Sequence, residues 1–320
     1  MKVFFTDQPH PVILERFEAA GIQSTVDTQC TYDELLVQMP DYDGLVVRSR
    51  ISIDAGFIDK MGSRCRVIGR EGAGMETIDV AYAESKGVRC INSPEGNRDA
   101  VGEHATGLLL ALFDKIALAN DEVRQGLWNR EANRGLEVKG KTVGIIGFGN
   151  MGAAFAQRLM GFECNIIAYD KYLPEHTKAN FQRLNYVRQG SLQELQSQAD
   201  IVSLHIPLTE ESHYLVDESF LASFQNPIYL INTARGKVVK TAALVEAMEK
   251  GQVLGAALDV IEYENMAKDG LRKEELPEPF RYLIQSNRTV LTPHVGGWTV
   301  ESKFKLAAFL ADKIIVELNK

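Results

Sequence analysis

Short apolar runs recur along the chain and are separated by stretches in which apolar residues follow a helical spacing. Each run is long enough for a buried parallel strand, and each intervening stretch for a helix. Strands alternating with helices predict parallel sheets, whose ligands gather at the carboxyl ends of the strands. The predicted strands are 3–5, 44–47, 67–69, 88–91, 142–146, 165–169, 201–204, 228–231, 254–258 and 290–291, and the main helices are 12–20, 81–86, 97–118, 241–250 and 299–318.

The length of 320 residues predicts two domains rather than one core. The fold class expected is α/β with two doubly wound parallel-sheet domains. The charged, Asn-, Gly- and Pro-containing stretch 262–278 interrupts the alternation, and it predicts a surface insertion or lid, with a disordered linker as the alternative.

The segment 141–170 predicts a dinucleotide-binding strand, turn, helix and strand. Gly147, Gly149 and Gly152 give the spacing G-x-G-x-x-G: the first glycine permits the bend, the second lets a pyrophosphate approach, and the third lets the helix pack closely. Asp170 ends the next strand, where the ribose hydroxyls of NAD need an acceptor. Its charge would repel a 2′-phosphate, which predicts a preference for NAD over NADP. The positive charge of Lys171 beside it could weaken this preference. The alternative is a Gly-rich turn in another α/β protein.

Three charged or titratable residues follow strands in the same half: Arg235, Glu264 and His294. Hydride chemistry on a carbonyl needs a fixed cation to polarise the oxygen and a group that titrates near neutral pH to exchange its proton. Arginine and histidine have these properties, and a carboxylate would hold the histidine ring. The alternatives are a surface turn for Arg235, a solvated acidic face for Glu264 and a loop histidine for His294. His205 also ends a strand and is assigned to packing near the cofactor.

The net charge of −8 disfavours nucleic acid or an anionic membrane as the main partner. It does not exclude an anionic substrate, because a few arginines can reverse the local field. Four scattered cysteines without a C-x-x-C pair predict reduced, apolar thiols, and no spacing predicts a metal site. Without a signal peptide or a membrane-length apolar run, a cytoplasmic protein is expected.

The ordered motifs of this half resemble those of the D-isomer-specific 2-hydroxyacid dehydrogenases. Five motifs from 147 to 297 carry the resemblance: Gly147-Phe148-Gly149-Asn150-Met151-Gly152, His205-Ile206-Pro207-Leu208-Thr209, Asn232-Thr233-Ala234-Arg235-Gly236, Ala257-Leu258-Asp259-Val260 and Thr292-Pro293-His294-Val295-Gly296-Gly297.

The resemblance implies a flavodoxin-like substrate-binding domain formed by 1–97 and 293–320, with an NAD-binding Rossmann domain, 98–292, inserted in it. It also implies roles for single residues. Arg235 would bind and polarise the substrate, and His294, paired with Glu264, would be the acid/base. The backbone at Ala73 and Gly74 would receive the substrate carboxylate. NAD would be held by residues of the five motifs and by Asp170, which follows the first motif. These residues are Gly147, Gly149, Asn150, Met151, Gly152, Asp170, His205, Pro207, Thr209, Thr233, Ala234, Asp259 (at the nicotinamide end), Gly296 and Gly297.

Within the family the chain is most similar to D-3-phosphoglycerate dehydrogenases, which implies a role in serine biosynthesis. Arg48-Ser49-Arg50 and Arg70 would bind a phosphate. The family also implies a homodimer, in which Arg130 and Arg134 would add charge from a neighbouring subunit. Because the chain ends soon after its last helix, no serine-binding regulatory domain and no feedback by serine are expected.

The chain departs from the family pattern at Met75-Glu76-Thr77, Asn265 and Trp298, which affects the expected shape of the substrate pocket. Two other functions stay open. The first is a hydroxypyruvate or glyoxylate reductase, which would use the same catalytic residues without phosphate recognition. The second is an NAD-sensing binding protein similar to the corepressors of this family.

Overall fold

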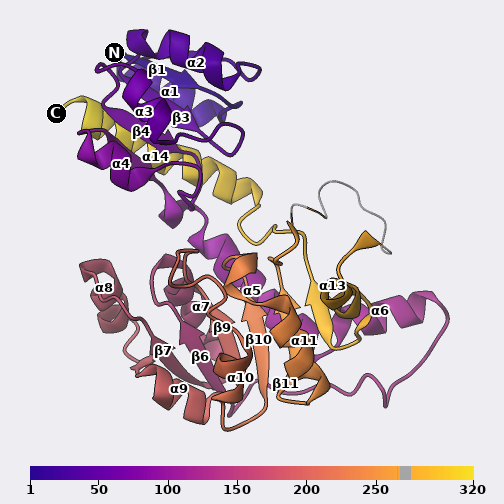
Figure 1. The fold of residues 1–320 in the computed structure, drawn as a ribbon. Coiled ribbons are helices and arrows are strands. Elements are labelled where there is room, and N and C mark those ends of the chain that lie inside the picture. The colour runs from indigo at the N-terminus through magenta and orange to yellow at the C-terminus, as the bar shows by residue number, and fades with distance from the viewer. Residues whose placement is uncertain (265, 267–274) are drawn as a thin grey trace. The chain divides into compact units, whose positions relative to one another are not determined.

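The computed structural model describes residues 1–264, 266 and 275–320. They form two compact units, Met1–Arg98 with Trp298–Lys320, and Asp99–Gly297 (Figure 1). The first boundary lies one residue from the predicted one, but the second lies five residues later. The reason is that the stretch after Thr292 belongs to the second unit, where backbone N–H groups of His294, Val295 and Gly296 donate to Asp259.

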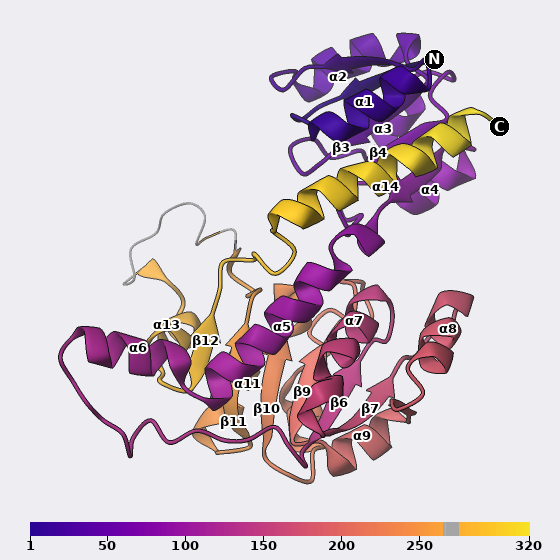
Figure 2. The same cartoon turned by 180° about the vertical axis from the view of Figure 1, so that it is seen from behind.

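The first unit is built on a five-stranded parallel sheet of order β2-β1-β3-β4-β5, the flavodoxin-like order. C-terminal α14 packs beside α1 and crosses the sheet at Gly69, where a Cβ atom would lie 2.6 Å from Ile314 Cδ1 (Figure 2). The strands are β1 (Lys2–Phe5), β2 (Gln23–Val26), β3 (Gly44–Val47), β4 (Val67–Arg70) and β5 (Arg89–Asn92), and the helices are α1 (Pro11–Ala19), α2 (Tyr32–Gln38), α3 (Ala55–Lys60), α4 (Val80–Ser85) and α14 (Val300–Leu318).

The second unit has a seven-stranded parallel sheet of order β12-β11-β10-β9-β6-β7-β8. Counted along this unit, the order is that of a Rossmann sheet with one more strand at the edge. The strands are β6 (Thr142–Ile146), β7 (Asn165–Tyr169), β8 (Arg188–Gln189), β9 (Ile201–Leu204), β10 (Ile228–Asn232), β11 (Val253–Leu258) and β12 (Thr289–Leu291). The predicted α/β class with two doubly wound sheets is confirmed.

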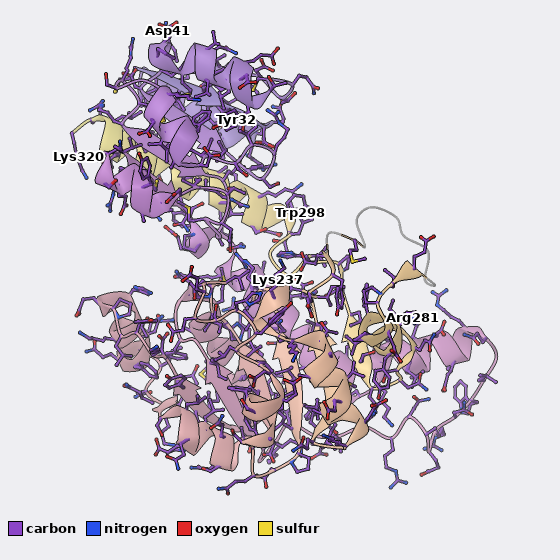
Figure 3. All side chains as sticks on the ribbon, in the orientation of Figure 1. Tyr32, Asp41, Lys237, Arg281, Trp298 and Lys320 are labelled. Carbon is purple, nitrogen blue, oxygen red and sulfur yellow. The ribbon has the colours of Figure 1, made fainter. Side chains whose placement is uncertain are left out.

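Helices cover the sheet of the second unit, and charged side chains such as Lys237 and Arg281 lie on its outside (Figure 3). The helices are α5 (Arg98–Phe113), α6 (Ile116–Arg124), α7 (Asn150–Leu159), α8 (Glu175–Arg183), α9 (Leu192–Gln198), α10 (Glu218–Ala222), α11 (Thr241–Glu249) and α13 (Glu278–Gln285). Short 3-10 helices occur at Met39–Asp41, Pro94–Gly96, Met160–Phe162 and Gly236–Val238. None of the described helices is long and apolar enough to cross a membrane.

The single helix predicted for 97–118 is wrong. Lys115 has a φ of 52°, in the left-handed region, and this divides the segment into α5 and α6. The sequence pattern also missed β2, α3, α8 and α10, which are short and largely polar on their exposed sides. Of the insertion predicted at 262–278, residues 265 and 267–274 lie outside the described part, and this includes Asn265.

Candidate active site

The three motif glycines have different surroundings in the turn between β6 and α7. Gly147 has a φ of 88°, and a Cβ atom there would lie 2.5 Å from the carbonyl oxygen of His205. A Cβ atom at Gly152 would lie 2.0 Å from the carbonyl oxygen of Gly147. At Gly149 the nearest atom, Nε2 of His176, is 3.8 Å away. The first and third glycines therefore let protein pack on protein, whereas the second borders open space that fits a pyrophosphate.

The N-terminus of α7 faces this turn. The helix starts at Asn150 and Met151, and its N-cap, Gly149, has no side chain that could satisfy the first N–H groups. Such a helix end attracts anions through its backbone N–H groups and its dipole. The residues present therefore fit the phosphates of a dinucleotide.

Asp170 at the end of β7 is oriented by the same turn. Its Oδ2 accepts a hydrogen bond from the Phe148 N–H at 2.7 Å, and its Oδ1 accepts one from the Tyr172 N–H at 3.0 Å. A carboxylate has lone pairs for further donors, so ribose hydroxyls fit here. Lys171, which could have softened the preference for NAD, forms an ion pair with Glu211.

The loop after β9 holds a neutral histidine. His205 Nε2 lies 2.8 Å from Ser203 Oγ, and burial lowers the pKa of His205 to about 3. The ring is therefore neutral near neutral pH, and the packing role expected for it near the cofactor stays a prediction. Its buried Nδ1 has no hydrogen-bond partner among the described residues. In the same loop, Ser212 Oγ donates to the Pro207 carbonyl at 2.7 Å, and the Ser212 N–H donates to Thr209 Oγ1 at 3.2 Å.

The loop after β10 carries Arg235 and is clamped by Asn232, a role that sequence reasoning missed. Asn232 Oδ1 accepts from the Ala234 N–H at 3.0 Å, and its Nδ2 donates to the Arg235 carbonyl at 3.0 Å. The Arg235 guanidinium donates to the Ala234 carbonyl at 2.7 Å. Thr233 Oγ1 is buried without a partner among the described residues, and a bound ligand could satisfy it.

The loops after β10 and β11 press against each other at Gly236. A Cβ atom there would lie 1.9 Å from the carbonyl oxygen of Ile261, so only glycine fits. Glu264 follows in the second loop, where its Oε1 accepts from the Ile261 N–H at 3.3 Å. The close contact between Gly236 and Ile261 therefore places the loop that carries Arg235 next to the loop that carries Glu264.

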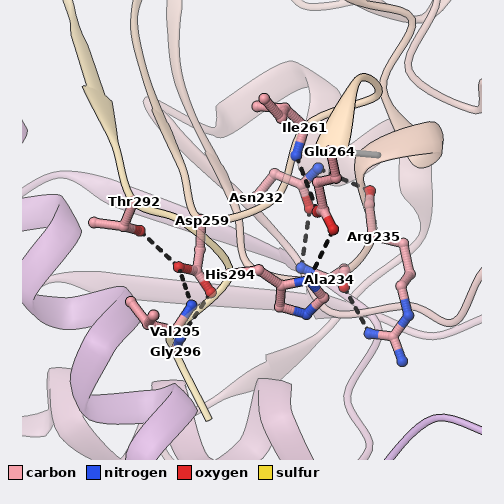
Figure 4. A network of polar contacts seen from close by, with 10 residues as sticks. All are labelled: Asn232, Ala234, Arg235, Asp259, Ile261, Glu264, Thr292, His294, Val295 and Gly296. Atoms are coloured by element: carbon pink, nitrogen blue, oxygen red, sulfur yellow. Dashed lines mark hydrogen bonds and ion pairs between the residues drawn. The ribbon is translucent and has the colours of Figure 1, made fainter. Parts of the chain in front are cut away.

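His294 and Glu264 form the pair that the sequence predicted. His294 Nδ1 lies 3.0 Å from Glu264 Oε2, and the side chains are 45% and 23% exposed (Figure 4). His294 has a φ of 57°, and its N–H donates to the Asp259 carbonyl at 2.8 Å. A residue in this backbone region persists when its surroundings fix it. With Nδ1 facing the carboxylate, Nε2 is the ring nitrogen left for a substrate.

Asp259 fixes the loop that carries His294. Its buried carboxylate accepts from Thr292 Oγ1 at 2.6 Å, from the Val295 N–H at 2.9 Å and from the Gly296 N–H at 2.8 Å. Burial alone would raise the pKa of Asp259, but these bonds, with that from His104, hold it at about 2. The predicted contact of Asp259 with the nicotinamide stays a prediction.

His104 on α5 is a further residue that the sequence did not assign to the site. Its Nε2 lies 3.2 Å from Asp259 Oδ1 and 3.0 Å from Thr292 Oγ1. Its ring also lies close to Gly296, where a Cβ atom would be 3.2 Å from His104 Cδ2. No local pattern signals this contact, because α5 lies far from Asp259 in the sequence.

The residues predicted to bind substrate lie in the first unit. Arg48, Ser49 and Arg50 follow β3, and Arg70 ends β4. Arg48 Nη2 lies 2.9 Å from Glu71 Oε1. Arg50 Nε and Nη2 donate to the Thr6 carbonyl at 3.2 and 2.6 Å.

The loop after β4 is held from two sides. The Ala73 carbonyl accepts from Asn92 Nδ2 at 2.5 Å, and Thr77 Oγ1 donates to the Arg48 carbonyl at 3.2 Å. Gly74 lies between these contacts. Thr77, one of the residues that depart from the family pattern, therefore connects the loop after β4 to the loop after β3. At the other departure, Trp298 is exposed and Lys303 Nζ lies 4.3 Å from the centre of its ring.

The second unit has the construction of a nicotinamide-dependent dehydrogenase, because a dinucleotide turn and a carboxylate-supported imidazole share one sheet edge. Residues 106–296 match the family described as D-isomer specific 2-hydroxyacid dehydrogenase, NAD binding domain. The chain belongs to this family. It is an oxidoreductase that uses NAD, and this favours an enzyme over the NAD-sensing binding protein. No group of three metal-ligating side chains occurs within residues 1–264, 266 and 275–320.

Similar proteins differ in their named substrates. Hydroxypyruvate reductase of Thermotoga maritima is 36% identical, over 90% of this chain and 88% of its own. D-3-phosphoglycerate dehydrogenase of Archaeoglobus fulgidus is 31% identical over 98% of this chain, which spans only 57% of that relative. D-lactate dehydrogenase of Aquifex aeolicus, solved with NAD and lactic acid, is 25% identical with a TM-score of 0.79, covering 98% of this chain and 94% of the other.

Proposed function

We propose that the protein transfers hydride between NAD and a 2-hydroxy acid, with His294 as the proton donor and acceptor. The observation that supports this most is the 3.0 Å contact between His294 Nδ1 and Glu264 Oε2, in loops that follow neighbouring strands. The nicotinamide, when bound, accepts or supplies the hydride. In the oxidative direction, Nε2 of neutral His294 takes the hydroxyl proton, and Glu264 stabilises the imidazolium that forms. Arg235 binds the carboxylate and polarises the oxygen at the reacting carbon.

For the substrate, we favour a short, unphosphorylated 2-oxo acid such as hydroxypyruvate or glyoxylate. All three arginines that would suit a phosphate already have protein acceptors, Arg48 in Glu71, Arg50 in the Thr6 carbonyl and Arg70 in the Glu71 carbonyl. The hydroxypyruvate reductase that matches nearly the full length of both chains supports the same choice. The second candidate is D-3-phosphoglycerate dehydrogenase, which the arginines at the ends of β3 and β4 favour. This ranking places the unphosphorylated 2-oxo acids first, whereas the sequence analysis placed the phosphorylated substrate first.

One assay tests the function and ranks the substrates. NADH oxidation is followed with hydroxypyruvate, glyoxylate, 3-phosphohydroxypyruvate and pyruvate side by side, at one ionic strength. We expect the highest kcat/KM with hydroxypyruvate or glyoxylate. Binding of NADH without turnover of any 2-oxo acid would contradict the proposed reaction, and preference for 3-phosphohydroxypyruvate would favour the second candidate.

We also propose a homodimer formed through α6 and the segment that follows it. In this segment, 116–136, large apolar side chains point to solvent, and Trp128 is 76% exposed. The others are Ile116, Val123, Leu127 and Leu136. An exposed apolar patch of this kind usually marks an interaction site. Arg130 and Arg134 belong to the same segment, so the dimer would place their charges at the interface.

A further inference from the structure

Glu71 is a buried carboxylate in the loop that follows β4. Its side chain is 3% exposed, and its Oε1 accepts a hydrogen bond from Arg48 Nη2 at 2.9 Å. A buried acid is costly unless a cation balances it, so each partner holds the other in place. Burial raises the pKa of Glu71, and the charge of Arg48 opposes this rise.

This ion pair lies where a ligand is expected to bind in the first unit. β3 pairs with both β1 and β4, so the strand order reverses beside it. Ligands of open α/β sheets bind outside the carboxyl ends of the strands at this reversal. The residues after β3 and β4 include the three arginines Arg48, Arg50 and Arg70, which would suit an anion.

Two carboxylates lower the positive charge at these strand ends. One is Glu71, and the other is Asp7, whose Oδ2 accepts from the Arg48 N–H at 3.2 Å. These two carboxylates offset part of the positive charge of the three arginines. A short 2-oxo acid brings one negative charge. A phosphorylated acid brings a phosphate with a further charge of about −2 at pH 7, which Arg48 could meet only by leaving Glu71 unbalanced.

We propose that Glu71 determines the substrate class by keeping Arg48 occupied. The enzyme then accepts monoanionic short 2-oxo acids and discriminates against phosphorylated ones. This inference rests on the proposed function and assigns its specificity to one ion pair.

The test is the variant Glu71→Gln, which keeps the shape of the side chain but removes its charge. The kcat/KM values for hydroxypyruvate and 3-phosphohydroxypyruvate are measured at one ionic strength. We expect the ratio to shift by about tenfold or more toward the phosphorylated acid, through a lower KM, because Arg48 is released. Glu71→Asp, which keeps the charge, should retain the wild-type ratio. The matched control is Glu84→Gln, which removes a half-exposed charge from α4 of the same unit.

An unchanged ratio in Glu71→Gln, or an equal shift in Glu84→Gln, would overturn the proposal. If Glu71→Gln does not fold, the wild-type enzyme still tests it, because a higher kcat/KM for 3-phosphohydroxypyruvate than for hydroxypyruvate is incompatible with the inferred exclusion. Failure of the reaction itself is distinguishable, since no 2-oxo acid would then be reduced by any form of the protein.

Discussion

At the level of single residues, His294 is the group on which the proposed reaction depends. Replacing His294 by Ala removes the proton donor, so kcat should fall about 10²- to 10⁴-fold. The ring lies outside the glycine turn, so the dissociation constant for NADH should stay within about threefold of wild type. Stopped-flow turnover and NADH fluorescence titration measure the two quantities separately. A kcat equal to that of wild type would remove His294 from the mechanism.

Asp259 predicts a pH dependence of stability. Its pKa is held at about 2, below the ordinary 3.8, so folding favours the carboxylate. This contribution is fully present above about pH 4 and is lost as the pH falls from about 4 to about 2. It amounts to roughly 2 kcal/mol of unfolding free energy. Urea unfolding of wild type and Asp259→Asn should differ by a constant amount from pH 8 to 5.

That difference should shrink only below pH 4, where the wild-type carboxylate takes up its proton. A difference that already falls between pH 7 and 5 would show that another group titrates in its place. Asp259→Asn should also lower kcat, because His294 loses the support of its loop.

The sequence predicted the residues that lie in motifs but not those that support them. Glu264 and His294 were predicted as a pair and lie 3.0 Å apart. Asn232 stood in a quoted motif without a role, and His104 and Glu71 were given no function, because each acts through a partner brought near by the fold. A polar side chain between apolar neighbours looks the same in sequence whether it faces solvent or a buried carboxylate.

At the level of elements, the turn between β6 and α7 makes a prediction about its glycines. Gly149→Ala should fold normally, because its Cβ would have no neighbour closer than 3.8 Å. It should nevertheless weaken NADH binding by about tenfold or more, since the methyl group occupies the approach of the pyrophosphate. Thermal unfolding and NADH titration test the two parts of this expectation.

Gly152→Ala serves as the contrasting variant. Its Cβ would lie 2.0 Å from the Gly147 carbonyl oxygen, so it should lower the unfolding free energy by several kcal/mol, on the order of the largest single-residue effects. Wild-type NADH affinity in Gly149→Ala would show that the phosphates do not approach this glycine.

Buried strands were the elements that the sequence predicted best. The runs at Gly44–Val47, Thr142–Ile146 and Ile201–Leu204 coincide with strands because both faces of each are covered. The edge strand β2 was not predicted, because its residues are mostly exposed and show no apolar run. The break between α5 and α6 at Lys115 was not predicted for another reason. Lysine has no intrinsic preference for the left-handed conformation, so the break depends on how the flanking helices pack.

At the level of the whole molecule, the first unit contains both ends of the chain, Met1–Arg98 and Trp298–Lys320. In the structure α14 covers the sheet of the first unit, and Arg16 on α1 donates to the Ala308 carbonyl at 2.9 Å. The second boundary of the compact units lies five residues after the predicted one, because periodicity does not reveal the hydrogen bonds of the Asp259 carboxylate.

The proposed dimer makes the last prediction. Trp128→Glu places a charge in the exposed apolar segment, and a desolvated carboxylate without a partner is strongly unfavourable at an interface. Sedimentation velocity should therefore show a dimer for wild type and a monomer for Trp128→Glu. The matched control is Val37→Glu, which places the same charge at another exposed apolar residue, on α2 of the first unit. Because Val37 lies outside the proposed interface, this variant should remain dimeric, and a dimer in both variants would rule out this segment as the contact.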